Sequence, residues 1–498
     1  MNPRAKAALE ISLGAVILGI LGDALLRAVP WGINGGLWML AALMVISALA
    51  RHRPEALSGG GAWLFVPAVI FSAGFAWRAS PVLAMLNLLV LGVTASLALL
   101  RAQGGRVLDS GLAQYALGAI LAGVNASFGA LLLAFKDMPW KELSARRWTD
   151  RSVAVARGVL LSIPPLVIFG ALFASADAMF EKLAVNVLHF DFQTLVSHGL
   201  LFALFAWASA GWLRGAALGE ERKFVARETP PKSFSLGIIE TGIVLGLLDL
   251  LFLAFVLIQI RYLFGGAMHI QASTGLTYAE YARRGFFELV TVATLALPFL
   301  LSAHWMLRKE DPAGERAFRV LAGALVVLLF VVMASAVKRM RLYQFEYGQT
   351  ELRVYSTAFM GWLGVVLVWF GLTVLRGRRQ HFAAGALVVG YALIVALEVV
   401  NPDALISRTN LARALEGRKF DATYVSSLSA DAVPNLVAAL PHLTPEERCV
   451  ISERLIERWP ASRQSDWQTW NRSRAEAERV IGENRPALLQ MSCPEKKP

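Results

Sequence analysis

Charged residues are scarce in this chain of 498 residues. Asp, Glu, Lys and Arg make up only 17% of it, hydrophobic residues make up 56%, and the mean hydropathy is +0.54. A soluble fold cannot bury that much apolar surface, so lipid must solvate a large part of the chain. The shortage of charge therefore excludes an ordinary soluble globular protein.

The familiar catalytic and ligand-binding motifs are also missing. No glycine-rich loop ends in Gly-Lys-Ser/Thr, and no His-Glu-x-x-His, Gly-x-Ser-x-Gly or Cys-x-x-Cys occurs. These gaps argue against a P-loop ATPase, a metalloprotease, a serine hydrolase and a zinc cluster. The seven histidines are scattered. We therefore expect no metal, no cofactor and no catalytic residue, and we lean away from an enzyme.

Long apolar runs fill the chain as far as Val400. Each run is about 17 to 25 residues long, the length of one helical bilayer crossing, and helices satisfy their own backbone groups in lipid. The first run has no cleavage site for a signal peptidase and should stay in the membrane. We predict an all-α polytopic bundle with twelve crossings, at residues 8–28, 32–50, 62–78, 81–100, 110–135, 155–176, 196–213, 235–260, 285–306, 318–337, 352–375 and 382–400.

The net charge of +12 comes from basic residues in short loops, so we expect no nucleic-acid partner. The loops around 136–157, 214–232, 308–319 and 376–379 hold about 18 Lys and Arg, against about 8 in the alternate loops. The basic set should be cytoplasmic, which places the tail after Val400 outside. Five predicted runs before Lys136 would put the N-terminus outside, unless one of them does not cross.

The C-terminal tail, 401–498, is polar and rich in helix formers. A capping box at Thr444 to Glu447 predicts a helix to about Trp459, and 465–484 predicts another. The only two cysteines, Cys449 and Cys493, lie here. A disulfide between them is permitted if the tail is outside, and free thiols are the alternative. We divide the chain at 1–150, 151–400 and 401–498.

Carboxylates interrupt several apolar runs, and a charge at membrane depth is costly unless it is paired, hydrated or protonated. Asp249 lies in mid-helix, and Glu240 lies nine residues earlier on the opposite face, so the two cannot pair. Asp23 and Glu398 are further candidates. The alternative is structural, with each group holding the bundle together through hydrogen bonds between helices.

A dense polar string, 339–355, is predicted as an outer loop with a turn at Gly348 and a helix cap at Thr350. With 262–285 and 401–410 it could line an outer mouth, although an interfacial belt of Tyr and Arg explains it equally well. The candidate residues of this mouth are Tyr281, Arg283, Arg284, Glu288, Arg339, Arg341, Tyr343, Glu346, Tyr347, Thr350, Arg353, Asn401 and Asp403.

Four segments of the chain stand out together: 277–289, 347–353, 401–404 with Asp421, Tyr424 and Asp431, and 175–180. They resemble one family of bacterial multi-pass membrane proteins of unknown function. The resemblance covers roughly 157–434. It implies a bacterial inner membrane and no chemistry.

Three hypotheses about function remain. The first is a non-enzymatic binding, sensing or assembly protein that uses its outer face and has the tail as a docking site for a protein partner. The second is a secondary transporter that uses the intramembrane carboxylates. The third is an intramembrane enzyme acting on a lipid-linked substrate at the outer mouth. The lipid bilayer is a partner in all three.

Overall fold

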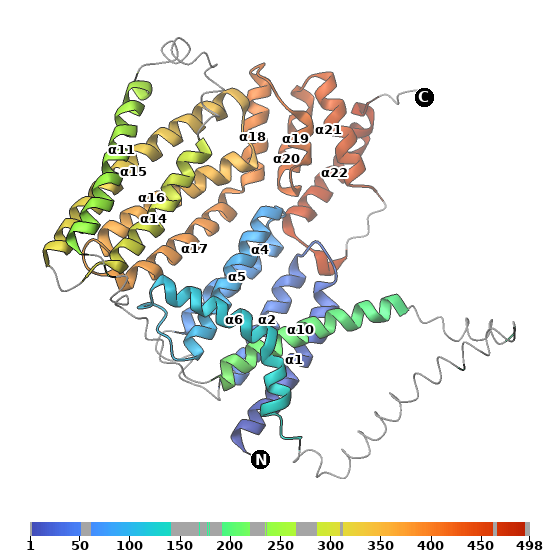
Figure 1. Cartoon of the computed structure of the whole chain (residues 1–498). Coiled ribbons are helices and arrows are strands. Elements are labelled where there is room, and N and C mark those ends of the chain that lie inside the picture. The colour runs from blue at the N-terminus through green and yellow to red at the C-terminus, as the bar shows by residue number, and fades with distance from the viewer. Residues whose placement is uncertain are drawn as a thin grey trace.

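The structure is a computed structural model of the chain. It describes residues 2–50, 61–140, 192–219, 237–264, 286–308, 312–461 and 466–493, together with 169, 177, 179 and 235. All regular structure within these ranges is helical. Figure 1 places the N-terminus at one end of the molecule and the tail, in orange and red, towards the other. The predicted all-α bundle is confirmed.

The N-terminal half is built on a long antiparallel helix pair, α1 and α10. Gly22 of α1 lies against Phe205 of α10, where an added Cβ would come within 2.5 Å of the ring. Small residues of this kind let helix backbones approach closely in lipid. The helices of this half are α1 (Pro3–Leu26), α2 (Ile33–Leu49), η2 (Ala62–Leu64), α4 (Phe65–Trp77), α5 (Pro81–Ala102), α6 (Leu112–Leu132), η3 (Leu133–Asp137) and α10 (Phe192–Leu218).

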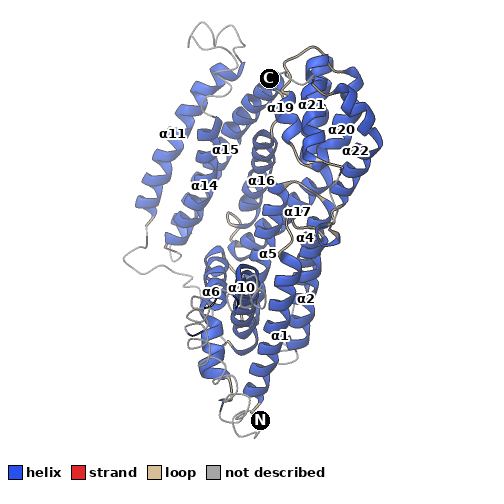
Figure 2. Ribbon diagram, turned by 90° about the vertical axis from the view of Figure 1, so that its right-hand side faces the viewer, coloured by secondary structure: helices blue, strands red, loops and turns tan. Residues whose placement is uncertain are grey.

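The second half is a bundle packed around Phe318 and Phe370, which are fully buried. Its helices are α11 (Ile238–Phe264), α14 (Phe286–Met306), α15 (Pro312–Tyr347), α16 (Glu351–Thr373) and α17 (Phe382–Val400). Helix α11 packs mainly on α15, and both views place it at the outer edge of the bundle (Figures 1 and 2). The two halves meet where α17 packs on α4 and α5.

Eleven of the twelve predicted runs coincide with helices. In the described ranges nine helices are long and apolar enough to cross a membrane, and 33–49 and 62–77 are shorter apolar helices. The remaining predicted run, 155–176, lies outside the described residues. The apolar pattern therefore located the described membrane helices correctly.

Helix α15 is longer than predicted. Its 36 residues extend to Tyr347, so 339–347 is helix and the predicted outer loop is wrong there. At 1.5 Å per residue the helix is about 54 Å long, well beyond a hydrocarbon core of about 30 Å. The turn is confined to 348–350, which confirms the turn predicted at Gly348. This glycine has φ 75°, in the left-handed region that glycine adopts readily.

The tail folds into a compact helical domain with its own core, which includes Ile406, Val433 and Ile451. The capping box is confirmed, since the Thr444 amide donates to Glu447 Oε2 at 3.0 Å at the start of its helix. The second predicted helix is shifted, beginning at Arg472. The elements are α18 (Pro402–Leu415), α19 (Ala422–Ser427), η6 (Ala430–Ala432), α20 (Val433–Ala439), η7 (Leu440–His442), α21 (Pro445–Arg458), η8 (Trp467–Thr469) and α22 (Arg472–Met491).

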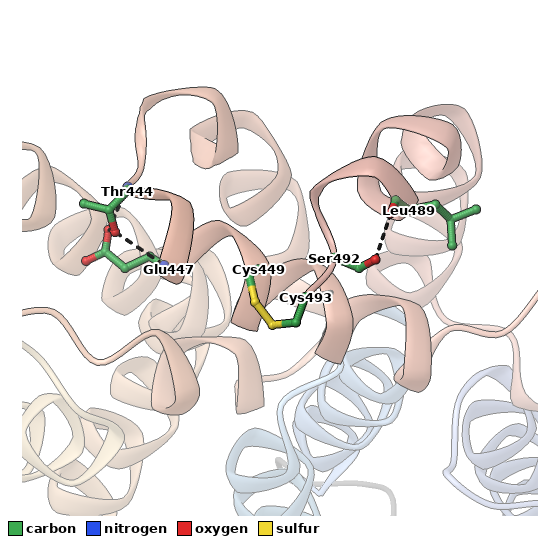
Figure 3. The surroundings of a disulfide bond; sticks show 6 residues. All are labelled: Thr444, Glu447, Cys449, Leu489, Ser492 and Cys493. Carbon is green, nitrogen blue, oxygen red and sulfur yellow. Dashed lines mark hydrogen bonds between the residues drawn. A yellow bond between two sulfur atoms is a disulfide. The ribbon is translucent and has the colours of Figure 1, made fainter. Parts of the chain in front are cut away.

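A disulfide joins Cys449 of α21 to Cys493, just after α22 (Figure 3). The two Cα atoms are 4.6 Å apart and the residues are 44 apart in sequence. The bond therefore closes most of the second half of the tail domain into one loop. Of the two alternatives that the sequence left open, the structure has the disulfide.

An ion-pair network at the end opposite the tail bears on the orientation of the N-terminus. The Asp137 carboxylate lies 2.8 Å from both Arg4 and Arg214, so the start of α1 and the ends of η3 and α10 meet there. Gly118 of α6 lies against Leu100, near the end of α5. Helix α6, with η3, is long and apolar enough to span a membrane.

Candidate functional site

The outer polar residues gather where the tail domain meets the ends of the membrane helices. We call this region the joint. On the tail side it consists of Asn401, Asp403, Asn410, Arg413, Tyr424, Ser429, Asp431, Asn471 and Ser473, and on the membrane side of the ends of α4, α15, α16 and α17. Helix ends leave backbone groups without intrahelical partners. Side chains of the tail domain supply many of those partners.

Asp431 lies at the centre of the joint and is buried. Its Oδ1 accepts hydrogen bonds from Ser473 Oγ at 2.6 Å and from Asn401 Nδ2 at 3.0 Å. Its Oδ2 accepts from the Ala79 amide at 2.8 Å, between α4 and α5, and the Arg78 guanidinium lies 3.5 Å away. A buried carboxylate is stable when it is hydrogen-bonded and paired in this way.

The turn between α15 and α16 is held by α18. Asn410 donates to the Gln349 carbonyl at 2.8 Å and accepts from the Gln349 amide at 2.7 Å. Arg413 donates to the Glu346 carbonyl at 2.9 Å at the end of α15. A Cβ on Gly348 would lie 2.5 Å from Asn410 Oδ1, so both the conformation and the space call for glycine.

The start of α16 is capped from the tail domain instead of by its own side chain. Thr350 occupies the predicted cap position but makes no side-chain cap bond, so that part of the prediction is wrong. The Tyr424 hydroxyl accepts the Glu351 amide at 2.9 Å in its place. Burial raises the pKa of Tyr424, which keeps the phenol protonated.

The end of α4 is capped by the start of α22. Asn471 Nδ2 donates to the carbonyls of Phe75 and Arg78, both at 2.8 Å, and Ser473 donates to the Trp77 carbonyl at 3.0 Å. The joint therefore reaches helices from both membrane halves. The tail domain is an integral cap on the bundle.

Two of the predicted mouth residues, Asn401 and Asp403, belong to the joint. Asn401 has a left-handed backbone, with φ 58°, and its side chain caps α18. Asp403 is fully buried; its Oδ2 accepts the Ser429 amide at 3.2 Å, and its Oδ1 has no hydrogen-bond partner among the described residues. Burial, with Asp431 as a lesser cause, raises the pKa of Asp403, against its bonds to Ser429.

The other predicted mouth residues lie in separate places. The Arg353 guanidinium stacks on Tyr343 at 4.0 Å and donates to the Gly348 carbonyl at 2.5 Å, while Tyr347 packs edge-on against Tyr343. Arg339 is buried and donates to Gln259 of α11 at 3.1 Å. Exposed positions are Glu288, Arg341 and Glu346, and Tyr281, Arg283 and Arg284 lie outside the described residues.

Two of the four intramembrane candidates are paired. Asp23 lies 2.7 Å from Arg27 and 2.6 Å from His198 Nδ1, between α1 and α10. Glu398 of α17 accepts from Asn87 of α5 at 2.9 Å, and thus links the two halves. Glu240 is exposed in the first turn of α11. These positions agree with the structural alternative for Asp23 and Glu398.

Asp249 differs from the others. It lines an open groove of ≈ 800 Å³ between α11 and α15, with Gly242, Gly246 and Leu250 on one wall and Leu321 and Ala324 on the other. Both of its carboxylate oxygens are buried, and neither has a hydrogen-bond partner among the described residues. The prediction that Asp249 and Glu240 do not pair is confirmed.

Sequence reasoning missed the two glycines beside Asp249. A Cβ added to Gly242 or Gly246 would meet no atom within 4 Å, so packing within the described chain does not require glycine there. The signal was available as Gly-x-x-x-Gly inside an apolar run, a spacing typical of helix docking in membranes.

The fold and these sites define a multi-pass α-helical integral membrane protein. The family model described as "Domain of unknown function (DUF4153)" matches residues 65–439, and the chain belongs to this family. The match confirms the resemblance to an uncharacterised family and begins well before residue 157, where the resemblance was expected to start. No curated protein and no solved structure matches the chain significantly.

Proposed function

We propose that this chain is a non-enzymatic binding and assembly protein that associates with another integral membrane protein. The observation that carries the proposal is the groove at Asp249. A buried carboxylate with no partner among the described residues is costly in lipid, and such residues are by default functional. A second membrane protein in the groove would supply what the carboxylate lacks.

The joint supports a structural role for the outer polar residues. Asp431, Asn410 and Tyr424 direct their hydrogen bonds to other parts of the same chain. Binding a ligand through these groups would break contacts that hold the tail to the bundle. The predicted protein partner of the tail would therefore bind its outer surface, away from the joint.

The transporter hypothesis is the second candidate, and Asp249 supports it as an ion site. Against it, Asp23 and Glu398 are engaged with other residues, and α11 lies at the edge of the bundle. Proton-dependent flux through reconstituted vesicles that is lost in Asp249→Asn would favour transport over assembly.

We also propose a location in the bacterial inner membrane, with the N-terminus in the cytoplasm and the tail in the periplasm or outside the cell. The contact of Arg4 with Asp137, next to the basic segment that begins at Lys136, supports a cytoplasmic N-terminus. This orientation requires that one of the first five predicted runs does not cross the membrane. The disulfide supports an oxidising compartment for the tail. Alkaline phosphatase fused after Pro498 should be active, and an inactive fusion would overturn this topology.

Site-specific photo-crosslinking in native membranes tests the proposed function. A benzophenone amino acid replaces Leu250 in the groove or, as a control, Val365, an exposed position on α16. We expect a discrete protein adduct only from position 250, and its loss when Gly246→Ile is added to a chain that still folds. Lipid adducts alone from both positions would contradict the proposal.

A further inference from the structure

We infer that the groove between α11 and α15 binds one transmembrane helix of the partner, and that this helix carries a Lys or Arg at the depth of Asp249. The inference rests on the proposed function and specifies its partner. It draws on three features of the groove: its shape, its depth in the bilayer and its charge.

The shape of the groove suits a helix. Gly242 and Gly246 lie one turn apart on α11, and both face open space. Ala324 adds a third small residue from α15. Surfaces of small residues let a second helix come close enough for backbone contact, which is how helices associate in lipid. Leu247 and Leu250, both largely exposed, flank the glycines and can pack on its sides.

The depth of Asp249 excludes most other cations. Asp249 lies in the middle of the 27-residue helix α11, about 16 Å from Ile238 at 1.5 Å per residue. A lipid headgroup amine stays at the membrane surface, about half a hydrocarbon thickness away. A basic side chain carried in by a transmembrane helix reaches this depth.

The charge of the groove selects the partner's side chain. Arg339, the buried cation on α15, bonds to Gln259, ten residues beyond Asp249 and thus about 15 Å further along α11. Arg339 therefore lies at a different depth of the bundle and does not pair with Asp249. A second copy of this chain docked by the same face would bring two Asp249 carboxylates together, which like charges disfavour. A Lys or Arg at this level is attracted strongly, because the surroundings have a low dielectric constant.

A designed peptide provides the test. The full chain, labelled with a fluorescent donor, is reconstituted in vesicles with a Leu/Ala transmembrane peptide that carries an acceptor and a central Lys, or a central Leu as the matched peptide. We expect the Lys peptide to associate about tenfold more tightly, corresponding to one interhelical polar contact. Asp249→Asn should weaken association of the Lys peptide to the level of the Leu peptide.

Three further variants separate the effect of the groove's shape from the effect of its charge. Gly246→Ile should abolish association of both peptides, whereas Gly361→Ile on α16, where a Cβ also meets open space, should leave it unchanged. Asp249→Lys should reverse the preference, so that a peptide with a central Glu associates more tightly than the Lys peptide. Size-exclusion profiles identical to wild type show that each variant is folded.

The outcomes distinguish the inference from the proposed function. The Lys and Leu peptides could associate equally, and both could lose this association in Gly246→Ile. That result would overturn the inference that the partner helix carries a basic residue, and it would leave the proposed assembly through the groove intact. Peptide association that is unchanged in Gly246→Ile, together with no protein adduct from position 250, would overturn both the inference and the proposed function. A position-250 adduct with the mass of a dimer of this chain would overturn the inference in favour of self-association.

Discussion

Two aspartates of this protein, Asp431 in the joint and Asp249 in the groove, meet the cost of burial in opposite ways. Asp431 accepts hydrogen bonds from Ser429, Ser473, Asn401 and a backbone amide, and it pairs with Arg78. Asp249 has no such partner among the described residues. The first carboxylate is explained by the fold of its own chain. The second is not, which is why we assign it to a partner.

The difference also changes the meaning of the outer polar strings. Charged and tyrosine-rich residues at one membrane face suggested a mouth for a ligand. Most of those in the joint instead cap the ends of membrane helices, a task that every buried helix end imposes. A polar cluster at a membrane surface is therefore weak support for a binding site until its partners are known.

Removing Asp431 should have the largest effect. Asp431→Ala leaves the Asn401 side chain and the Ala79 amide without their acceptor and Arg78 without its counter-charge. Breaking a buried pair on one side costs about 3–5 kcal/mol. Denaturant unfolding in detergent, monitored in the tail domain, should show this loss. An unchanged midpoint would mean that the joint does not stabilise the protein.

Removing the disulfide should come next. Replacing Cys449 and Cys493 by Ser frees a long loop in the unfolded tail and should lower its stability by about 2–4 kcal/mol. Reducing agent should lower the wild-type melting temperature and leave the double variant unaffected. Equal responses of the two proteins to the reductant would show that the bond is absent in the membrane-inserted chain.

Truncating Asn410 should have a moderate effect. Asn410→Ala removes both bonds to Gln349 and leaves two partly buried backbone groups without these partners, at a cost of about 1–3 kcal/mol. Asn484→Ala, which loses only a bond within its own helix, is the control. Greater protease sensitivity at 348–350 should accompany the first change only. Equal losses in both variants would argue against a special role of the joint.

Asp403→Asn should have the smallest effect, and its sign should depend on pH. Burial raises the folded-state pKa of Asp403 above its ordinary value of 3.8. The stability that the protonated Asp403 contributes is fully present below the ordinary pKa of 3.8, and it is lost as the pH rises through the folded-state pKa. At pH 7 the variant should therefore be at least as stable as wild type. It should lose this advantage in stability below about pH 4. Destabilisation at pH 7 would contradict this account.

The membrane helices were predictable because hydrophobic length alone defines them, as for α5 and α17. The end of α15 was not, because Arg339 and Arg341 mark the end of the apolar run and not the end of the helix. The cap of α16 was missed for a related reason. Its partner, Tyr424, lies 73 residues away, and no local pattern encodes that contact.

The candidate site was predictable only in part. The helical period correctly separated Asp249 from Glu240, since both lie on one regular helix. The pairing of Asp431 with residues near Ala79, 352 positions earlier, depends on how the two halves pack. The groove depends on what α11 leaves uncovered, which follows from tertiary structure.

The stability of Asp249→Leu tests the central comparison most directly. If Asp249 serves a partner and not the fold, the isolated variant should unfold at the same denaturant concentration as wild type or at a higher one, because leucine removes a buried charge with no partner. Its unfolding midpoint should therefore be higher than that of Asp431→Ala. A loss of about 3–5 kcal/mol in Asp249→Leu, like that of Asp431→Ala, would show that Asp249 supports the fold and would contradict the account.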